Sequence, residues 1–294
     1  MRDLVIPMCA LETLHQGSLW AEGPVYMPVA DCLIWSDIPN NRLLQWVEGL
    51  GVRPFNVTSN NTNGNTLDRE GRLVSCEHLS RAVTRREHDG SRTVLATHFD
   101  GKRLNSPNDV VVKSDGTIWF TDPTYGILSD YEGKRADPEQ PRCHVFRLDP
   151  ETGTVTAVVS DMVKPNGLAF SLDEQTLYVA DTGISHQVDG PHHIRAYPIA
   201  SDGLPGEGRV FADISPGAPD GFRLDEFGNI WTSSANGVHV YAPDGAHLGR
   251  VIVPETVANL TFGGPKNNRL FITATTSLYA MYVGVRGATR RENL

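Results

Sequence analysis

A two-strand pattern recurs six times along this chain of 294 residues. Each copy opens on an asparagine, aspartate or glutamate and continues with a short apolar stretch and a turn. The first strongly apolar residue of a second stretch follows 10 or 11 positions after the opening residue. The copies open at Glu22, Asn63, Asn108, Asn166, Asp220 and Asn259, at intervals of 39 to 58 residues. Helical periodicity is nearly absent, so the chain is predicted to be all-β.

Repeats of about 50 residues, each with material for four strands, are typical of propeller blades. The sequence therefore predicts a six-bladed β-propeller that forms a single domain over residues 1–294. The 20 or so residues before Glu22 are expected to supply an outer strand that joins the first blade to the last. A pair of β-sandwiches, the competing all-β arrangement, would not explain six equivalent repeats.

The six opening residues are predicted to meet at one mouth of the central channel, because the innermost strand of every propeller blade lies beside that channel. All six carry oxygen acceptors, and none is Lys or Arg. Asn and Asp also begin strands and cap turns for purely structural reasons, which is the alternative at any one position. Six equivalent positions favour an oxygen-lined cation site. Calcium prefers such ligands, whereas zinc prefers His and Cys.

The connections after each second strand are expected to overhang the same mouth. Two of them, at 121–142 and 180–193, are long insertions, and long loops over a polar mouth commonly recognise substrate. The pocket residues predicted from these connections are Glu77, His78, Asp122, Tyr125, Asp181 and His186. Of these, His78, Asp122 and Tyr125 are expected to bind substrate together with Asn63 and Asn108.

Composition excludes several functions. The net charge of −9, without a long basic stretch, argues against nucleic-acid binding. No apolar run approaches the roughly 18 residues of a membrane helix, and the N-terminus does not resemble a secretory signal. Four widely spaced cysteines suggest free thiols. A cytoplasmic monomer or small homo-oligomer is expected.

Five segments together resemble the sugar lactonase family of gluconolactonase and regucalcin (senescence marker protein). They are AEGPVY, LNSPNDVVV, GTIWFTDPTYG, PNGLAFSLDEQTLYVADTG and PDGFRLDEFGNIW, and the resemblance runs from Glu22 to the last repeat. The bacterial gluconolactonase-like branch is the closer match. Ser106 stands where regucalcin-like members have an arginine, which changes the expected sugar contacts.

The resemblance implies a hydrolase that opens a sugar lactone, such as gluconolactone, in carbohydrate catabolism. It implies Glu22, Asn166 and Asp220 as metal ligands, Asn108 as a substrate contact, and Asp220 as a possible general base as well. The implied cofactor is one divalent cation, Ca²⁺ first, with Zn²⁺, Mg²⁺, Mn²⁺ or Fe²⁺ as alternatives. A broader esterase or organophosphate hydrolase, and a non-catalytic calcium-binding propeller, are the competing functions.

Overall fold

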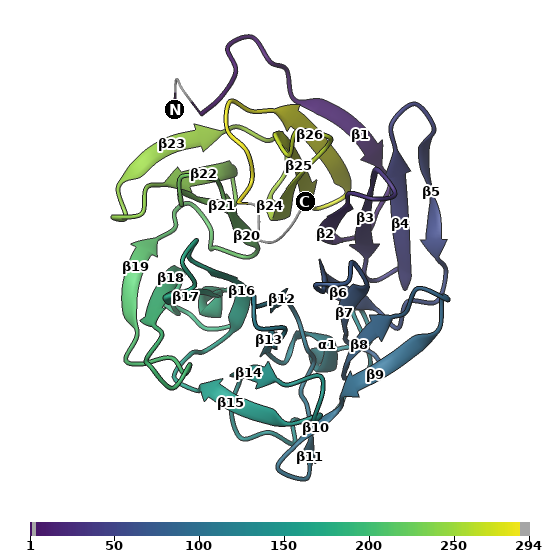
Figure 1. The fold of residues 1–294 in the computed structure, drawn as a ribbon, viewed down its shortest axis with the longest axis vertical. Helices are drawn as coiled ribbons and strands as arrows, with labels where there is room; N and C mark the ends of the chain where they lie inside the picture. The colour runs from purple at the N-terminus through teal and green to yellow at the C-terminus, as the bar shows by residue number, and fades with distance from the viewer. Residues whose placement is uncertain (2–3, 289–294) are drawn as a thin grey trace.

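Six four-stranded antiparallel sheets surround a common axis in the computed structural model, which describes Met1 and residues 4–288 (Figure 1). The predicted all-β six-bladed β-propeller is confirmed. Every second strand begins at or just before the apolar residue expected from the repeat, for example Leu73 in the second blade and Ile118 in the third. The turn residues of the sequence therefore mark the blade register correctly.

The blades follow chain order, with the innermost strand first in each. Blade 1 holds β2 (Ala21–Met27), β3 (Cys32–Asp37), β4 (Arg42–Val47) and β5 (Gly51–Asn56). Blade 2 holds β6 (Thr62–Leu67), β7 (Leu73–Glu77), β8 (Ala82–Arg86) and β9 (Arg92–Ala96). Blade 3 holds β12 (Val110–Val112), β13 (Ile118–Asp122), β14 (His144–Leu148) and β15 (Val155–Val159).

The second half of the chain repeats the arrangement. Blade 4 holds β16 (Pro165–Phe170), β17 (Thr176–Asp181), β18 (His193–Pro198) and β19 (Arg209–Asp213). Blade 5 holds β20 (Phe222–Leu224), β21 (Ile230–Ser234), β22 (Gly237–Tyr241) and β23 (His247–Val251). Blade 6 holds β24 (Val257–Gly263), β25 (Arg269–Ala274), β26 (Ser277–Tyr282) and, outermost, β1 (Glu12–Gln16).

The N-terminal strand closes the propeller, as the sequence predicted. β1 pairs antiparallel with β26, so the last blade takes its outer strand from the start of the chain. Arg269 of blade 6 fastens this closure: its guanidinium forms ion pairs with Glu12 of β1, at 2.9 Å, and with Glu48 of blade 1. The same guanidinium lies over the Trp46 ring, 4.8 Å from its centroid.

The apolar core lies between blades rather than within them. Six clusters of buried side chains each join two neighbouring blades, including the last and the first. The largest buried side chains are Trp35, Trp119 and Trp231, all on second strands. Successive side chains of a strand point to opposite faces of its sheet. Each blade can therefore pack apolar side chains against the neighbouring blade on either side.

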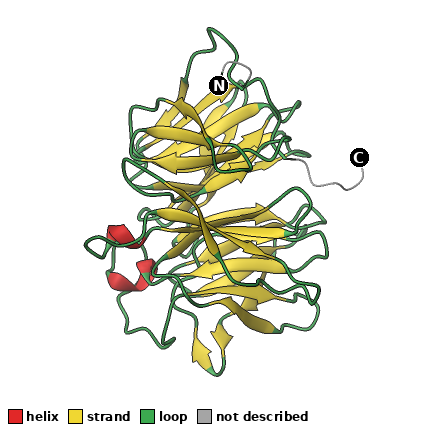
Figure 2. Cartoon of the chain, turned by 90° about the vertical axis from the view of Figure 1, so that its left-hand side faces the viewer, coloured by secondary structure: helices red, strands yellow, loops and turns green. Residues whose placement is uncertain are grey.

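Short segments distinguish the two faces of the propeller. Helix α1 (Tyr125–Leu128) and the 3₁₀ turn η1 (Gly183–Ser185) lie on the same face (Figure 2), which we call the mouth face. A small hairpin, β10 (His98–Phe99) and β11 (Lys102–Arg103), lies at the outer edge near blade 3 (Figure 1). Within the described residues, no helix has the length and apolar character needed to cross a membrane.

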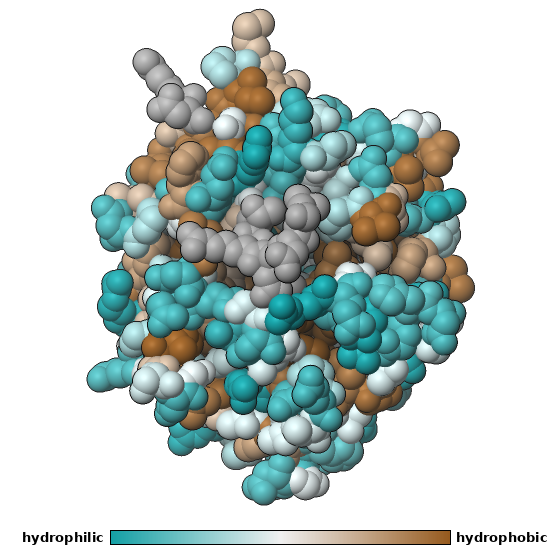
Figure 3. Space-filling model, viewed as in Figure 1, coloured by the Kyte–Doolittle hydropathy of each residue, from teal (hydrophilic) through white to brown (hydrophobic). Residues whose placement is uncertain are grey.

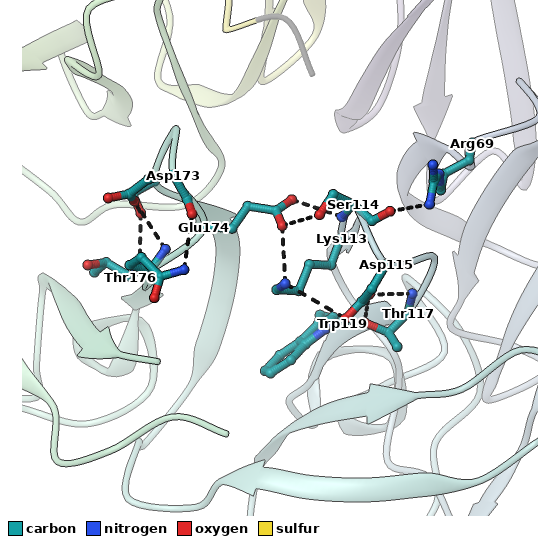
Figure 4. Close-up of polar contacts among 11 residues, drawn as sticks. Arg69, Lys113, Ser114, Asp115, Thr117, Trp119, Asp173, Glu174 and Thr176 are labelled. Carbon is teal, nitrogen blue, oxygen red and sulfur yellow. Dashed lines mark hydrogen bonds and ion pairs between the residues drawn. The ribbon is translucent and has the colours of Figure 1, made fainter. Parts of the chain in front are cut away.

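The opposite face, shown in Figure 3, is covered largely by hydrophilic side chains. Polar contacts between its turns join neighbouring blades (Figure 4). Glu174 of blade 4 accepts a hydrogen bond from the Ser114 backbone N–H at 2.8 Å and pairs with the Lys113 ammonium at 3.1 Å. Arg69 of blade 2 donates to the Ser114 carbonyl. These contacts hold blades 2, 3 and 4 in a fixed arrangement below the mouth.

Candidate metal and substrate site

Five of the six predicted ring residues line one pocket on the mouth face. The pocket has a volume of about 210 Å³ and is lined by Trp20, Glu22, Asn63, Asn108, Tyr125, Glu132, Asn166, Thr182, Ser185, His186 and Asp220. The sixth ring residue, Asn259, stands behind the pocket, where its amide Nδ2 donates to Glu22 Oε2 at 3.0 Å. The prediction that the strand openings converge is therefore confirmed for the described residues.

Backbone hydrogen bonds between neighbouring inner strands fix the ring. The Gly64 N–H of blade 2 donates to the Asn108 carbonyl of blade 3 at 2.7 Å, and the Gly167 N–H of blade 4 donates to the Asp220 carbonyl of blade 5 at 3.0 Å. The Asp220 N–H donates to Ser233 Oγ at 2.7 Å. The backbones of Asn108 and Asp220 are thus each held by their own blade and by the preceding one, which makes this part of the pocket preorganised.

Of the three carboxylates that line the pocket, Glu22 and Asp220 come from the ring and have no cationic partner in the described lining. Burial raises the pKa of Glu22 to about 8, and the charges of Asp109 and Glu132 act in the same direction, against hydrogen bonds from the Gly23 N–H and Asn259. Burial also raises the pKa of Asp220 well above its usual value, and repulsion from Glu22 adds to that rise. Ionisation of both carboxylates therefore raises the free energy of the folded protein.

The donor set fits a hard divalent cation. None of the described residues lining the pocket is Lys or Arg. Arg223, whose guanidinium lies 3.7 Å from Asp109 Oδ2, is not among them. No three His, Cys, Asp or Glu side chains of the described chain cluster as a metal site, so the candidate ligands are two carboxylates with amide oxygens. A cation that accepts oxygen ligands in adaptable geometry would neutralise the Glu22–Asp220 repulsion.

The pocket wall opposite Glu22 comes from blades 3 and 4. Tyr125 of α1 and His186, just after η1, have ring centroids 5.4 Å apart, and Tyr125 Oη lies 3.2 Å from Ser185 Oγ. The Thr182 hydroxyl donates to the Pro219 carbonyl at 2.6 Å, which ties this wall to the segment that carries Asp220. The two long insertions thus supply a partly aromatic, partly hydroxylated wall, as their position over the mouth predicted.

Four predicted pocket residues lie outside the pocket. Asp122 is fully buried, and its Oδ2 accepts the Asn105 N–H at 2.7 Å. His78 is also fully buried; its Nε2 lies 3.5 Å from Asn63 Nδ2, so it supports the wall from behind. Glu77 pairs with Arg92 at 2.6 Å, and Asp181 accepts the backbone N–H groups of Val163, Lys164 and Gly183. The expectation that these side chains face the pocket was wrong, because a position at a strand end does not fix the direction of the side chain.

Four lining residues were missed: Trp20, Glu132, Thr182 and Ser185. Thr182 and Ser185 lie in the long insertion after β17, and their position there was a usable signal. Trp20 lies two residues before Glu22, the opening residue of the first repeat, and could also have been inferred. Glu132 had no comparable signal, because its approach to the pocket depends on how the loop folds back.

The fold and this pocket define a β-propeller of the enzyme type, in which acids and amides from separate blades converge on one polar cavity. The chain belongs to the SMP-30/gluconolactonase/LRE-like family, whose model matches residues 20–276. It is 30% identical over 290 residues to a gluconolactonase of Zymomonas mobilis, covering 90% of this chain and 79% of that protein. It is 33% identical over 261 residues to the pentonolactonase XacC of Haloferax volcanii, covering 86% of this chain and 80% of that one.

Solved structures agree with the family assignment. A gluconolactonase of Xanthomonas campestris superposes with a TM-score of 0.88 at 41% identity, covering 95% of this chain and 91% of that one. A regucalcin of Agrobacterium tumefaciens superposes with a TM-score of 0.78 at 21% identity, covering 95% of each chain, which demonstrates the shared fold alone.

Proposed function

We propose that this enzyme hydrolyses a sugar lactone to the open-chain aldonic acid, using one divalent cation bound by Glu22, Asn166 and Asp220. The observation that carries the metal assignment is a pair of repelling carboxylates, Glu22 buried and Asp220 partly buried, in a pocket whose described lining contains no cationic side chain. The reaction class is supported by relatives named gluconolactonase, pentonolactonase and 6-deoxy-6-sulfogluconolactonase. Ca²⁺ is the first choice among cations because all the candidate donors are oxygens.

The size and polarity of the pocket favour a substrate with one ring. Its volume of about 210 Å³ lies below the roughly 300–1,000 Å³ of pockets that bind drug-sized ligands. Asn63 and Asn108 present amides, and Tyr125 and Ser185 present hydroxyls, so several substrate hydroxyls can be hydrogen-bonded at once. This arrangement suits an aldonolactone better than a large apolar ester.

The residues divide into three roles. The cation, when bound, would act as a Lewis acid that polarises the lactone carbonyl. Asn108, whose backbone is fixed by the Thr121 carbonyl at 2.8 Å, orients the carbonyl or the ring oxygen. Tyr125 and His186 cover the substrate and limit access of bulk water, which strengthens the polar contacts inside.

A panel of five- and six-carbon sugar lactones tests the proposal. Acid release is followed with a pH indicator for metal-loaded protein, chelated protein and chelated protein resupplied with Ca²⁺, Mn²⁺ or Zn²⁺, and spontaneous ring opening is subtracted. We expect rapid opening of at least one lactone, loss of activity on chelation and recovery with metal. A metal-loaded protein that accelerates none of the lactones above background would refute the proposal, and activity confined to aryl esters or organophosphates would favour the broader hydrolase.

A further inference from the structure

Among the described residues, Glu132 is the one pocket carboxylate that no donor reaches with a hydrogen bond. Glu22 accepts from the Gly23 N–H and from Asn259, and Asp220 is hydrogen-bonded by Asn166. Within the described part of the chain, the Glu132 carboxylate forms neither a hydrogen bond nor an ion pair, although it lines the same cavity. An acceptor held in a polar pocket without a protein donor is available to a ligand or a water molecule.

The backbone around Glu132 is held in place from three sides. The His78 ring Nδ1 lies 3.1 Å from the Glu132 carbonyl oxygen. The Lys134 N–H donates to the Gly126 carbonyl of α1 at 3.1 Å. A Cβ on Gly133 would lie 2.2 Å from the Gly126 carbonyl oxygen, and a Cβ on Gly126 would lie 2.5 Å from the His78 ring, so both close approaches require glycine.

His78 makes this support directional. Burial lowers the pKa of His78 to about 4, so the ring is neutral near pH 7. Because Nδ1 faces a carbonyl acceptor, it carries the hydrogen and donates, and Nε2 faces the Asn63 amide as an acceptor. The ring therefore fixes Glu132 and Asn63 relative to each other, which is the second layer of support that a precise catalytic group needs.

We propose that Glu132 is the general base of the lactonase reaction, accepting the proton of the water that attacks the lactone carbonyl. This assignment rests on the proposed function. The water oxygen forms a bond to the carbonyl carbon, the C=O π pair moves to the carbonyl oxygen, and the water proton moves to the Glu132 carboxylate. On collapse the bond from the carbonyl carbon to the ring oxygen breaks, and the ring oxygen takes the proton from Glu132. The product is the hydroxy acid, so no other reactant is needed.

Two properties favour Glu132 over Asp220 as the base. Asp220 is a proposed cation ligand, and coordination lowers the basicity of a carboxylate. Glu132 lines the same cavity and has no hydrogen-bond donor among the described residues, so its carboxylate is available to accept a proton. The titratable groups that share the cavity with Glu132 are Glu22, Asp220, Tyr125 and His186; His78 lies behind, and neighbouring Lys134 is exposed with its ammonium 3.4 Å from Asp130.

The test compares Glu132→Gln with Asp137→Asn, an exposed acid-to-amide change in the same loop. Both variants should fold and bind metal like the wild type, as measured by thermal unfolding and elemental analysis. For Glu132→Gln we expect kcat to fall about 100-fold or more, with KM changed only a few-fold and the acidic limb of the pH–rate profile lost. Glu132→Ala should regain part of its turnover when formate is added. Asp137→Asn should behave as wild type.

Three results would overturn the assignment. A Glu132→Gln variant that retains kcat within a few-fold shows that the proton goes elsewhere. A rise in KM with unchanged kcat makes Glu132 only a substrate contact, and a parallel loss of bound metal makes it a ligand. Wild-type protein that opens no sugar lactone refutes the proposed function and this role with it, whereas active wild type with an active variant refutes this role alone.

Discussion

The substitution Glu22→Gln tests whether two carboxylates repel each other in the metal-free pocket. Glutamine keeps an oxygen that can accept from the Gly23 N–H and from Asn259 Nδ2, as Glu22 does at 2.5 and 3.0 Å. The change therefore removes a charge while it preserves the hydrogen bonds. In metal-free protein it should raise the free energy of unfolding at neutral pH, and it should also lower the pKa of Asp220.

The magnitude follows from the pKa of Glu22, which burial raises from 4.5 to about 8. Between these values the folded protein keeps a proton that the unfolded chain has released, so the free energy of unfolding falls as pH rises. One pKa unit corresponds to about 1.4 kcal/mol, so Glu22 should remove about 3 kcal/mol between pH 5 and pH 7. The pKa of His78, lowered by burial to about 4, acts in the opposite sense but is present in both proteins and cancels in their difference.

Urea unfolding of chelated wild type and Glu22→Gln, followed by tryptophan fluorescence at pH 5 and pH 7, measures this difference. We expect the advantage of the variant to grow by about 3 kcal/mol from the lower to the higher pH. Any change in packing alters the free energy of unfolding by the same amount at both pH values. The part of the difference between variant and wild type that does not change with pH therefore serves as the internal control. An advantage that is the same at both pH values would refute the reasoning, since Glu22 would then not be held protonated in the folded protein.

Three further predictions concern the cation, the closure and the Glu132 loop. Calcium at about 100 times its Kd should stabilise wild type by about 2.7 kcal/mol in thermal unfolding and leave Asp220→Asn unchanged; equal shifts in both would place the cation elsewhere. Arg269→Met should lower the free energy of unfolding in urea by about 1–2 kcal/mol, because the guanidinium contacts with aromatic rings are lost. The control Arg250→Met, at an exposed position, should leave it unchanged. Equal stability of the two variants would contradict the role of Arg269 in closure. Gly126→Ala should lower kcat about 100-fold with metal content retained. Its control is Gly206→Ala, where a Cβ meets only ordinary contacts at 3.5 Å. Normal turnover in Gly126→Ala would show that the position of the Glu132 loop is unimportant.

The blades and the ring could be predicted from sequence because both depend on local chemistry repeated six times. Turn residues between short apolar stretches mark strand ends. The spacing of 10 or 11 positions, as from Glu22 to Leu33 and from Asp220 to Ile230, sets a common register. A residue in the same position of every blade must lie at the same height along the axis. The convergence of the ring residues on one pocket follows from that geometry without knowledge of side-chain contacts.

The wall of the pocket could not be predicted in the same way. Asp122 ends β13 at the mouth face, but its carboxylate turns beneath the Asn105 backbone instead of entering the pocket. Glu132 enters the pocket only because its loop packs on α1 and against His78 of another blade. Such contacts join segments far apart in the sequence, and no periodicity records them.

The pairing of β1 with β26 places the seam of the ring inside a sheet. Opening the molecule at this seam breaks a ladder of main-chain hydrogen bonds, instead of only separating the side chains of two blades. During synthesis, β1 is made before the other described strands but cannot reach its partner until residues 277–282 have followed. A chain that stops short of that point has an unpaired strand at each end, and such edges template aggregation. The ring can therefore close only after the last blade, including β26, has been synthesised.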